Sequence, residues 1–302
     1  MTLSRPMVGH LAMLAFAWLI SFSFTFGALV AGDIDPGVLT SLRFVVATAA
    51  LALVGKISGL SWRILLRNGW RWLIIGGLFA LYFITMFEAL RVTTPLATAA
   101  VFTLTPFIAA GFGWLLIGMR ANGVTLAALV LGAIGAVWVI FKADLSLSLA
   151  LSIGTGERLF FFGVIAHAAI PALTRRLSPD SAALEAALGS SLGALIISSL
   201  YAGPEVIKTD FASLRPLVWG VALYLGLVTT AVTFILIQVA VPRIAPGKVM
   251  AYTYLLPSLV LGQSIVSQRQ YEPALIYVGV ILTLIALAVL VMQDTVSTDQ
   301  SG

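Results

Sequence analysis

Few ionisable side chains interrupt the apolar stretches of this sequence, and their types indicate solute binding. His167 lies about midway along the apolar stretch 157–177. Histidine titrates near physiological pH, so His167 can hold a substrate carboxylate or carry a coupling proton. The alternative interpretation is a neutral imidazole that is bonded to a helix carbonyl.

Aromatic residues form a second group whose chemistry suits a cavity for an amphipathic solute. Rings can stack on the solute while their polar tips orient it. Trp18, Tyr82 and Tyr252 are the strongest choices because they lie at mid-depth, although a single ring more often faces lipid or packs between helices. The predicted substrate-binding residues are Trp18, Phe22, Phe79, Tyr82, Phe102, His167, Gln238, Tyr252 and Tyr254.

Charged residues near the ends of the apolar stretches suggest ion pairs. Arg43 and Glu88 are expected at equal depth near one face, and a lone charge at mid-membrane costs about 2.5–3.5 kcal/mol on insertion scales. Glu185 is expected to pair with Arg243 or Lys248 at the opposite face. The hypothesis is two gates that close alternately; the alternative is static pairs that fix helix register.

Motifs for catalysis and metal binding are missing from the sequence. It contains no His-Glu-x-x-His zinc motif, no glycine-rich phosphate loop and no paired carboxylates at mid-depth. Cysteine is absent as well, which excludes disulfides and thiolate metal sites. We therefore expect no enzyme activity, no catalytic residues, no metal and no cofactor.

Composition places these residues in a membrane protein. Of the 302 residues, 60% are hydrophobic and 10% are charged, whereas about a quarter are charged in a typical soluble domain. The formal net charge of +5 is consistent with membrane orientation and contact with anionic lipid, and it does not indicate nucleic-acid binding.

Ten apolar stretches are long enough to cross a bilayer as helices. The first is longer than the apolar core of a signal peptide, so we interpret it as a retained span. Basic residues are more frequent in the segments on the side of the N-terminus, which predicts that both termini are cytoplasmic. The expected helices are 8–30, 36–56, 70–92, 95–118, 122–141, 157–177, 180–202, 215–240, 246–267 and 272–293.

Paired prolines reveal an internal repeat. Pro95 and Pro106 lie 151 residues before Pro246 and Pro257, and the second proline of each pair interrupts an expected helix. A repeat of five spans inverts the second copy, and irregular helices commonly line the central site of such proteins. The expected fold is all-α, with ten transmembrane helices as two inverted five-helix repeats around a central cavity. Pro106 and Pro257 are the expected helix kinks.

Domain boundaries follow from this repeat and from the composition of the loops. The first repeat is expected at 1–142, a linker at 143–156, the second repeat at 157–293 and a cytoplasmic tail at 294–302. Ala128, Gly132 and Ala136 lie at four-residue spacing and predict close helix contact.

Two segments carry a resemblance to a known family. "FEALRVTTPLATAAVFTLTPFIAAGFGWLLIGMR" and "LIQVAVPRIAPGKVMAYTYLLPSLVLGQSIVSQR" resemble the ends of the two repeats in EamA-type members of the drug/metabolite transporter superfamily. "VIAHAAIPALTRRL" resembles the start of the second repeat, so the resemblance extends over essentially the whole chain. Within the superfamily, the sequence is most similar to YddG-type amino-acid exporters.

This resemblance implies a ten-helix exporter in the bacterial inner membrane. Its substrates would be aromatic and other neutral amino acids or related metabolites, moved through a central cavity by secondary or facilitated transport with alternating access. The alternative is polyspecific drug or cation efflux by proton antiport, which needs a membrane-embedded carboxylate. The expected partners are the small-molecule substrate and the bilayer, without nucleic acid, and the protein is expected to function as a monomer.

Overall fold

The computed structural model describes residues 4–67, 69–140, 154–268 and 273–299. In this part of the chain, nine helical spans are long and apolar enough to cross a membrane, and Gly123–Val139 is a shorter apolar helix. The ten predicted spans are therefore all present as helices. In the first half they are α1 (Arg5–Val30), α2 (Pro36–Ile57), α4 (Gly69–Leu90), α5 (Pro95–Phe102) with α6 (Thr105–Ile117), and α7 (Gly123–Ile140).

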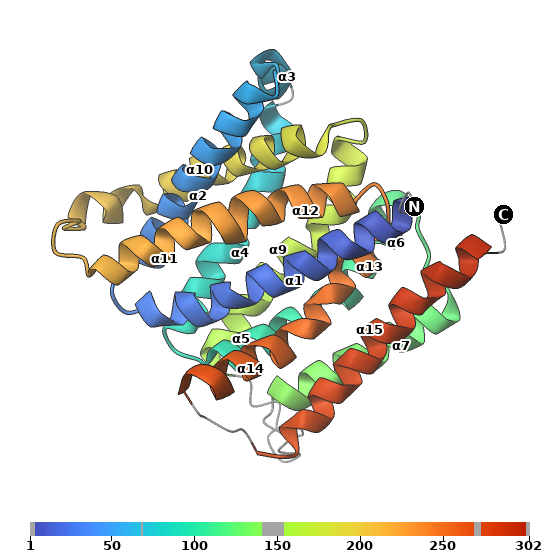
Figure 1. The fold of residues 1–302 in the computed structure, drawn as a ribbon. Helices are drawn as coiled ribbons and strands as arrows, with labels where there is room; N and C mark the ends of the chain where they lie inside the picture. Colours follow the sequence, from blue (N-terminus) through green and yellow to red (C-terminus); the bar gives the residue numbers. More distant parts are fainter. Residues whose placement is uncertain (1–3, 68, 141–153, 269–272, 300–302) are drawn as a thin grey trace.

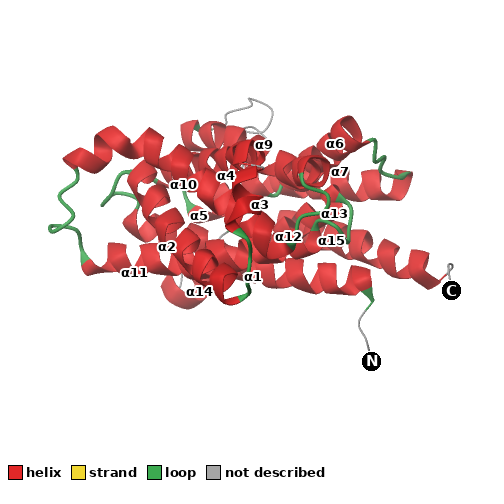
Figure 2. Ribbon diagram, turned by 90° about the horizontal axis from the view of Figure 1, so that it is seen from above, coloured by secondary structure: helices red, strands yellow, loops and turns green. Residues whose placement is uncertain are grey.

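The second half repeats this order of spans. It contains α9 (Thr155–Leu177), α10 (Ala183–Lys208), α11 (Pro216–Gly226), η1 (Leu227–Val232), α12 (Thr233–Ala240), α13 (Pro246–Ala251), η2 (Tyr252–Leu255), α14 (Leu256–Gln268) and α15 (Ile276–Asp299). Both termini lie at the same end of the molecule (Figures 1 and 2), as an even number of spans requires.

Several helix starts follow directly from local sequence. The Asp35 carboxylate accepts hydrogen bonds from the backbone N–H groups of Gly37 and Val38, and Pro36 is the first residue of α2. Thr94 caps α5 in the same way before Pro95. Such caps satisfy N–H groups that have no partner within the helix, and proline at the first position has no N–H to lose.

The predicted helix breaks at the paired prolines are confirmed. α5 ends at Phe102, and α6 begins at Thr105, one residue before Pro106. In the second half, the 3₁₀ helix η2 separates α13 from α14, which begins one residue before Pro257. Each break leaves carbonyl groups without their usual partner, and the Thr103 hydroxyl donates to one of them, the carbonyl of Ala100, at 2.6 Å.

Packing between the halves is reciprocal. Helices α2 and α7 pack on α10 and α15, which are their counterparts in the repeat. α6 packs on α13, the counterpart of α5, and α5 packs on α14, the counterpart of α6. α4 packs on α9, and in the same manner α12 packs on α1. This exchange of equivalent neighbours is what a twofold relation between two five-helix units produces.

Glycines permit the closest helix contacts. A Cβ atom on Gly193 of α10 would lie 1.9 Å from the carbonyl oxygen of Trp72 in α4. In α7, a Cβ on Gly132 would lie 2.2 Å from the ring of Tyr254, and the neighbouring Ala128 and Ala136 are buried. The predicted close contact of this small-residue stripe is confirmed.

The structure departs from the predicted boundaries in four places. α10 continues past Pro204 to Lys208 rather than ending at residue 202, and α15 continues to Asp299. A short helix, α3 (Trp62–Arg67), was not predicted, and η1, a π-helix, interrupts the eighth span. The predicted linker lies largely in 141–153, outside the described residues, so the domain boundaries remain a prediction.

Candidate functional site

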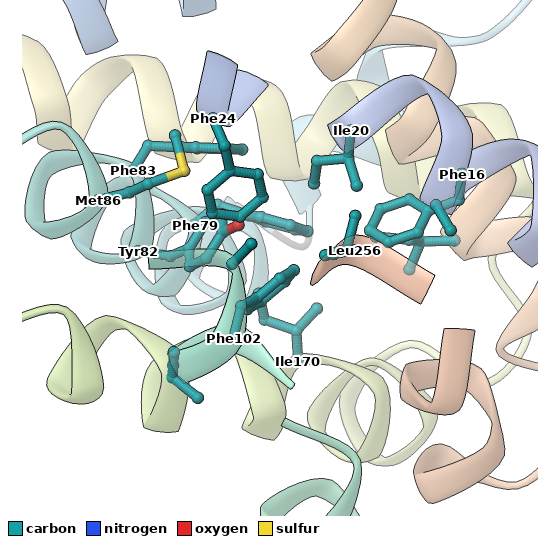
Figure 3. Close-up of a cluster of buried hydrophobic side chains, with 14 of the residues drawn as sticks. Phe16, Ile20, Phe24, Phe79, Tyr82, Phe83, Met86, Phe102, Ile170 and Leu256 are labelled. Carbon is teal, nitrogen blue, oxygen red and sulfur yellow. The ribbon is translucent and has the colours of Figure 1, made fainter. Parts of the chain in front are cut away.

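A cluster of aromatic rings fills the centre of the bundle, and His167 lies within it (Figure 3 shows several of these rings). The imidazole centroid lies 4.4 Å from the ring of Tyr82, 4.9 Å from Phe102 and 5.7 Å from Phe79. Helices α4, α5 and α9 supply these residues, so both halves contribute. The four side chains were predicted from the sequence as binding residues, and the structure brings them together.

Polar atoms in this cluster lack hydrogen-bond partners among the described residues. They are both ring nitrogens of His167 and the hydroxyl of Tyr82, and outside the ring contacts the amide nitrogen of Gln238 in α12 lacks a partner as well. All three side chains are buried, and a buried polar group without a partner costs about 1–3 kcal/mol. The alternative interpretation of His167, an imidazole bonded to a helix carbonyl, is therefore not what the structure contains.

Arg43 lies at the edge of the cluster and is fully buried in α2. Its guanidinium lies 3.6 Å from the centroid of the Phe83 ring, and Phe83 lies 4.7 Å from Tyr82 between ring centroids. Nε donates to the Thr230 hydroxyl at 2.9 Å, and Nη2 donates to the hydroxyl and the carbonyl of Thr229. Nη1 has no hydrogen-bond partner among the described residues, so one side of this buried guanidinium is left without an acceptor.

The π-helix η1 makes these acceptors available. The Thr229 and Thr230 hydroxyls both donate to the carbonyl of Leu225, at 3.1 and 2.7 Å, while they accept from Arg43. A Cβ on Gly226 would lie 2.8 Å from the carbonyl oxygen of Arg43, so a glycine there lets η1 approach α2. π-Helical turns inside α-helices occur frequently at functional sites.

The predicted ion pairs are not formed in this structure. Arg43 bonds threonines, and Glu88 instead pairs with Arg91 at 3.2 Å on the surface. The two side chains point toward different neighbours. Arg43 faces η1, which contains Thr229 and Thr230, whereas Glu88 lies at the end of α4, one helical turn before Arg91. At the other end, the Glu185 carboxylate accepts from Ser181, and Arg243 donates to the carbonyl of Val239. Lys248 lines a separate cavity.

Trp18 and Phe22 do not reach the central cluster, contrary to the prediction. Trp18 is 56% exposed because Phe16, Ile20 and Phe24 occupy the inward face of α1. Two residues correspond to about 200° of helix rotation, which turns Trp18 outward. With Gln263 of α14, Trp18 and Phe22 line a separate surface groove of about 450 Å³.

The two tyrosines near Pro257 also lie outside the cluster. The hydroxyl of Tyr252 lies 2.9 Å from Nδ1 of His10, which joins η2 to α1. The hydroxyl of Tyr254 donates to the carbonyl of Leu129 at 3.1 Å and so ties η2 to α7. Both side chains make helix contacts in this structure and lie apart from Tyr82 and His167, so a role of Tyr252 and Tyr254 in substrate binding stays a prediction.

Sequence reasoning missed several rings of the cluster. Phe234 of α12 stacks on Phe79 with centroids 3.9 Å apart, and Phe24 and Phe160 lie against Phe102. Phe160 and His167 are seven residues apart in α9 and share a face, which is a signal that the sequence contains. Phe24 and Phe234 belong to helices that are distant in sequence, so only the packing of these helices reveals that both rings lie in the cluster.

The helices and this site define a multi-pass helical membrane protein. Residues 7–141 match the EamA-like transporter family, so the first half of the chain contains a domain similar to that family. A solved structure described only as "Crystal structure of protein" has a TM-score of 0.73 at 17% sequence identity, over 96% of this chain and 98% of that chain. That likeness shows a shared fold alone. No curated protein matches.

Proposed function

We propose that the protein is a secondary or facilitative transporter that moves neutral, amphipathic amino acids or related metabolites by alternating access. The observation that supports this proposal is a buried aromatic cluster, built by both halves, in which His167 and the Tyr82 hydroxyl find no hydrogen-bond partner within the described part of the chain. Uncompensated polar atoms at mid-membrane are expensive, and they mark substrate pathways in membrane proteins. A small solute that bonds these atoms removes that cost.

The two kinds of group in the site match the two ends of such a solute. The rings of Phe79, Tyr82 and Phe102 offer an apolar surface for an aromatic or aliphatic side chain. The free Nη1 of Arg43 suits a carboxylate, and His167 and the Tyr82 hydroxyl suit an ammonium or amide group. A free cation is a poorer fit, because Glu88 and Glu185 bond elsewhere and the charge beside the rings is positive.

Helix breaks next to the site supply the movement that alternating access needs. Phe102, which packs on His167, is the last residue of α5, directly before the break at 103–104. A change of backbone angles at this break moves the ring that closes one side of the cluster. The equivalent break at η2 lies in the second half, so the two halves have matching hinge positions.

Export across a bacterial inner membrane, with both termini cytoplasmic and the monomer as the functional unit, belongs to the same proposal. The distribution of basic residues supports the orientation. Direction rests on the resemblance to amino-acid exporters.

Flux measurements in proteoliposomes test this function. The purified protein is reconstituted and assayed with labelled aromatic and aliphatic amino acids, cationic dyes and sugar phosphates, with and without a pH gradient. We expect saturable amino-acid flux. Flux that ignores the pH gradient identifies His167 as a binding group, whereas gradient-driven flux identifies a proton carrier. Dye extrusion without amino-acid flux would replace this proposal with cation efflux.

A further inference from the structure

Two adjoining cavities lie away from the central cluster, at the end of the molecule that carries the termini (α6, α7 and α13 in Figure 1). The first, of about 220 Å³, lies between the end of α6, the turn 118–122 and the start of α13. The second, of about 380 Å³, lies along α6 and α7. Both are lined by Ala110, Arg120 and Ala121, so Arg120 stands where they meet.

The first cavity is polar and positively charged. Arg120, Asn122, Thr125 and Lys248 line it, and the described residues place no carboxylate in the lining of either cavity. Arg120 is exposed and therefore accessible to a ligand. Positive charge continues behind the site, since Arg175 of α9 bonds the sulfur of Met119 beside Arg120.

The second cavity is apolar and shaped as a groove. Phe107 and Trp114 lie two turns apart on one face of α6 and are 45% and 58% exposed. Gly111 lies between them, and a Cβ atom there would meet nothing within 4 Å, so the glycine leaves a notch. Seven residues of helix span about 10 Å, which is enough to hold several methylene groups of a chain. Tryptophan near a helix end is typical of the membrane interface.

We propose that these two cavities together bind one anionic phospholipid of the surrounding leaflet. Arg120 holds the phosphate headgroup, and the groove along Phe107, Gly111 and Trp114 holds an acyl chain. Inorganic phosphate has no acyl chain that could fill the groove. In phosphatidylcholine, the positively charged ammonium of the headgroup would lie beside the positive charge of Arg120. Basic pockets between transmembrane helices bind anionic headgroups by this chemistry. The site joins α6 to α13, so the lipid contacts both halves, and the site is independent of the identity of the transported solute.

Lipid binding to the purified full-length protein tests this site. Native mass spectrometry with dioleoyl phosphatidylglycerol, dioleoyl phosphatidylcholine and inorganic phosphate separates headgroup from chain. We expect retention of phosphatidylglycerol by the wild type, reduced about fivefold in Arg120→Gln, as for one basic residue at an anionic surface. Gly111→Leu, which fills the notch, is expected to weaken lipid retention without changing phosphate binding.

Two matched variants control for charge and for side-chain volume. Arg63→Gln removes an exposed arginine that lines neither cavity, and Gly220→Leu fills open space at another helical glycine. Both are expected to bind lipid as the wild type does.

Equal retention of the two lipids, unchanged retention by Arg120→Gln, or equal binding of phosphate alone would each overturn the proposal. If Arg120→Gln melts at a lower temperature, Arg120→Lys must restore lipid binding, and failure to restore it also overturns the site.

Discussion

The rings of Tyr82 and His167 lie with their centroids 4.4 Å apart, and their polar atoms have no hydrogen-bond partner among the described residues. One residue comes from each half of the chain. Each unsatisfied group costs about 1–3 kcal/mol, and such costs concentrate where a protein needs the group for something other than stability. Mutations at this pair are therefore expected to change stability and solute binding in opposite directions, whereas most mutations lower both.

Tyr82→Phe tests this separation. Removal of an unpartnered hydroxyl is expected to raise the free energy of unfolding by about 1 kcal/mol and so raise the melting temperature. The same change is expected to raise the Michaelis constant for the transported amino acid about tenfold, because one hydrogen bond to the solute is lost. Thermal melting in detergent and proteoliposome flux measure the two effects.

Tyr254→Phe is the matched control for Tyr82→Phe. Its hydroxyl donates to the carbonyl of Leu129, so its loss is expected to lower the melting temperature. The flux of the remaining folded protein should keep its Michaelis constant. A lower melting temperature in Tyr82→Phe would show that its hydroxyl has a structural partner.

Arg43→Met tests the carboxylate contact. Thr229 and Thr230 keep their bonds to Leu225 without the guanidinium, so the variant is expected to fold. We expect at least tenfold weaker transport of an amino acid, and unchanged transport of the amine that lacks its carboxylate. Competition by the amine and by the amino acid in the same flux assay measures this difference.

Glu88→Gln accompanies this experiment as a control. Glu88 pairs with Arg91 on the surface, and exposed pairs contribute about 0–1 kcal/mol. Flux should therefore stay at the wild-type level. Loss of flux in Glu88→Gln, together with normal selectivity in Arg43→Met, would restore the gate hypothesis that the structure disfavours.

The sequence contained enough information for the spans and for the helix breaks. Apolar length, caps and proline positions act locally, so α5 and α6 break beside Pro106 as predicted. The same local rules could not rank the aromatic residues. Trp18–Phe22 and Phe16–Ile20–Phe24 both follow four-residue spacing along α1, and only the neighbouring helices decide which stripe faces inward. Arg43 shows the same limit, because its threonine partners are 186 and 187 residues away in a π-helix.

Trp18→Leu is expected to leave transport unchanged. Trp18 is 56% exposed and lines the surface groove that Phe22 and Gln263 also line, and this groove is separate from the cluster around His167. Phe102→Leu removes the ring that packs on the imidazole, and we expect it to weaken amino-acid binding about fivefold or more, which is the loss of about 1 kcal/mol of aromatic contact. Flux of both variants at equal amounts of folded protein decides between them. Equal loss in the two variants would place Trp18 on the transport pathway.

Gly193→Ala tests the contact of α10 with α4, the frame that holds Phe79 and Tyr82. The added Cβ would lie 1.9 Å from the carbonyl oxygen of Trp72, and a backbone atom cannot rotate away as a side chain can. We expect a loss of about 1–3 kcal/mol in the free energy of unfolding, because the two helices must move apart. The melting temperature in detergent measures this loss.

Gly220→Ala in α11 is the control with the opposite expected sign. Its Cβ would meet nothing within 4 Å, and alanine favours the helix by up to about 1 kcal/mol relative to glycine. The melting temperature should therefore rise or stay constant in Gly220→Ala while it falls in Gly193→Ala. Two equal decreases would mean that alanine is unfavourable at both helical glycines for reasons of helix conformation, and the close approach of α4 and α10 would then lose its role in holding the site.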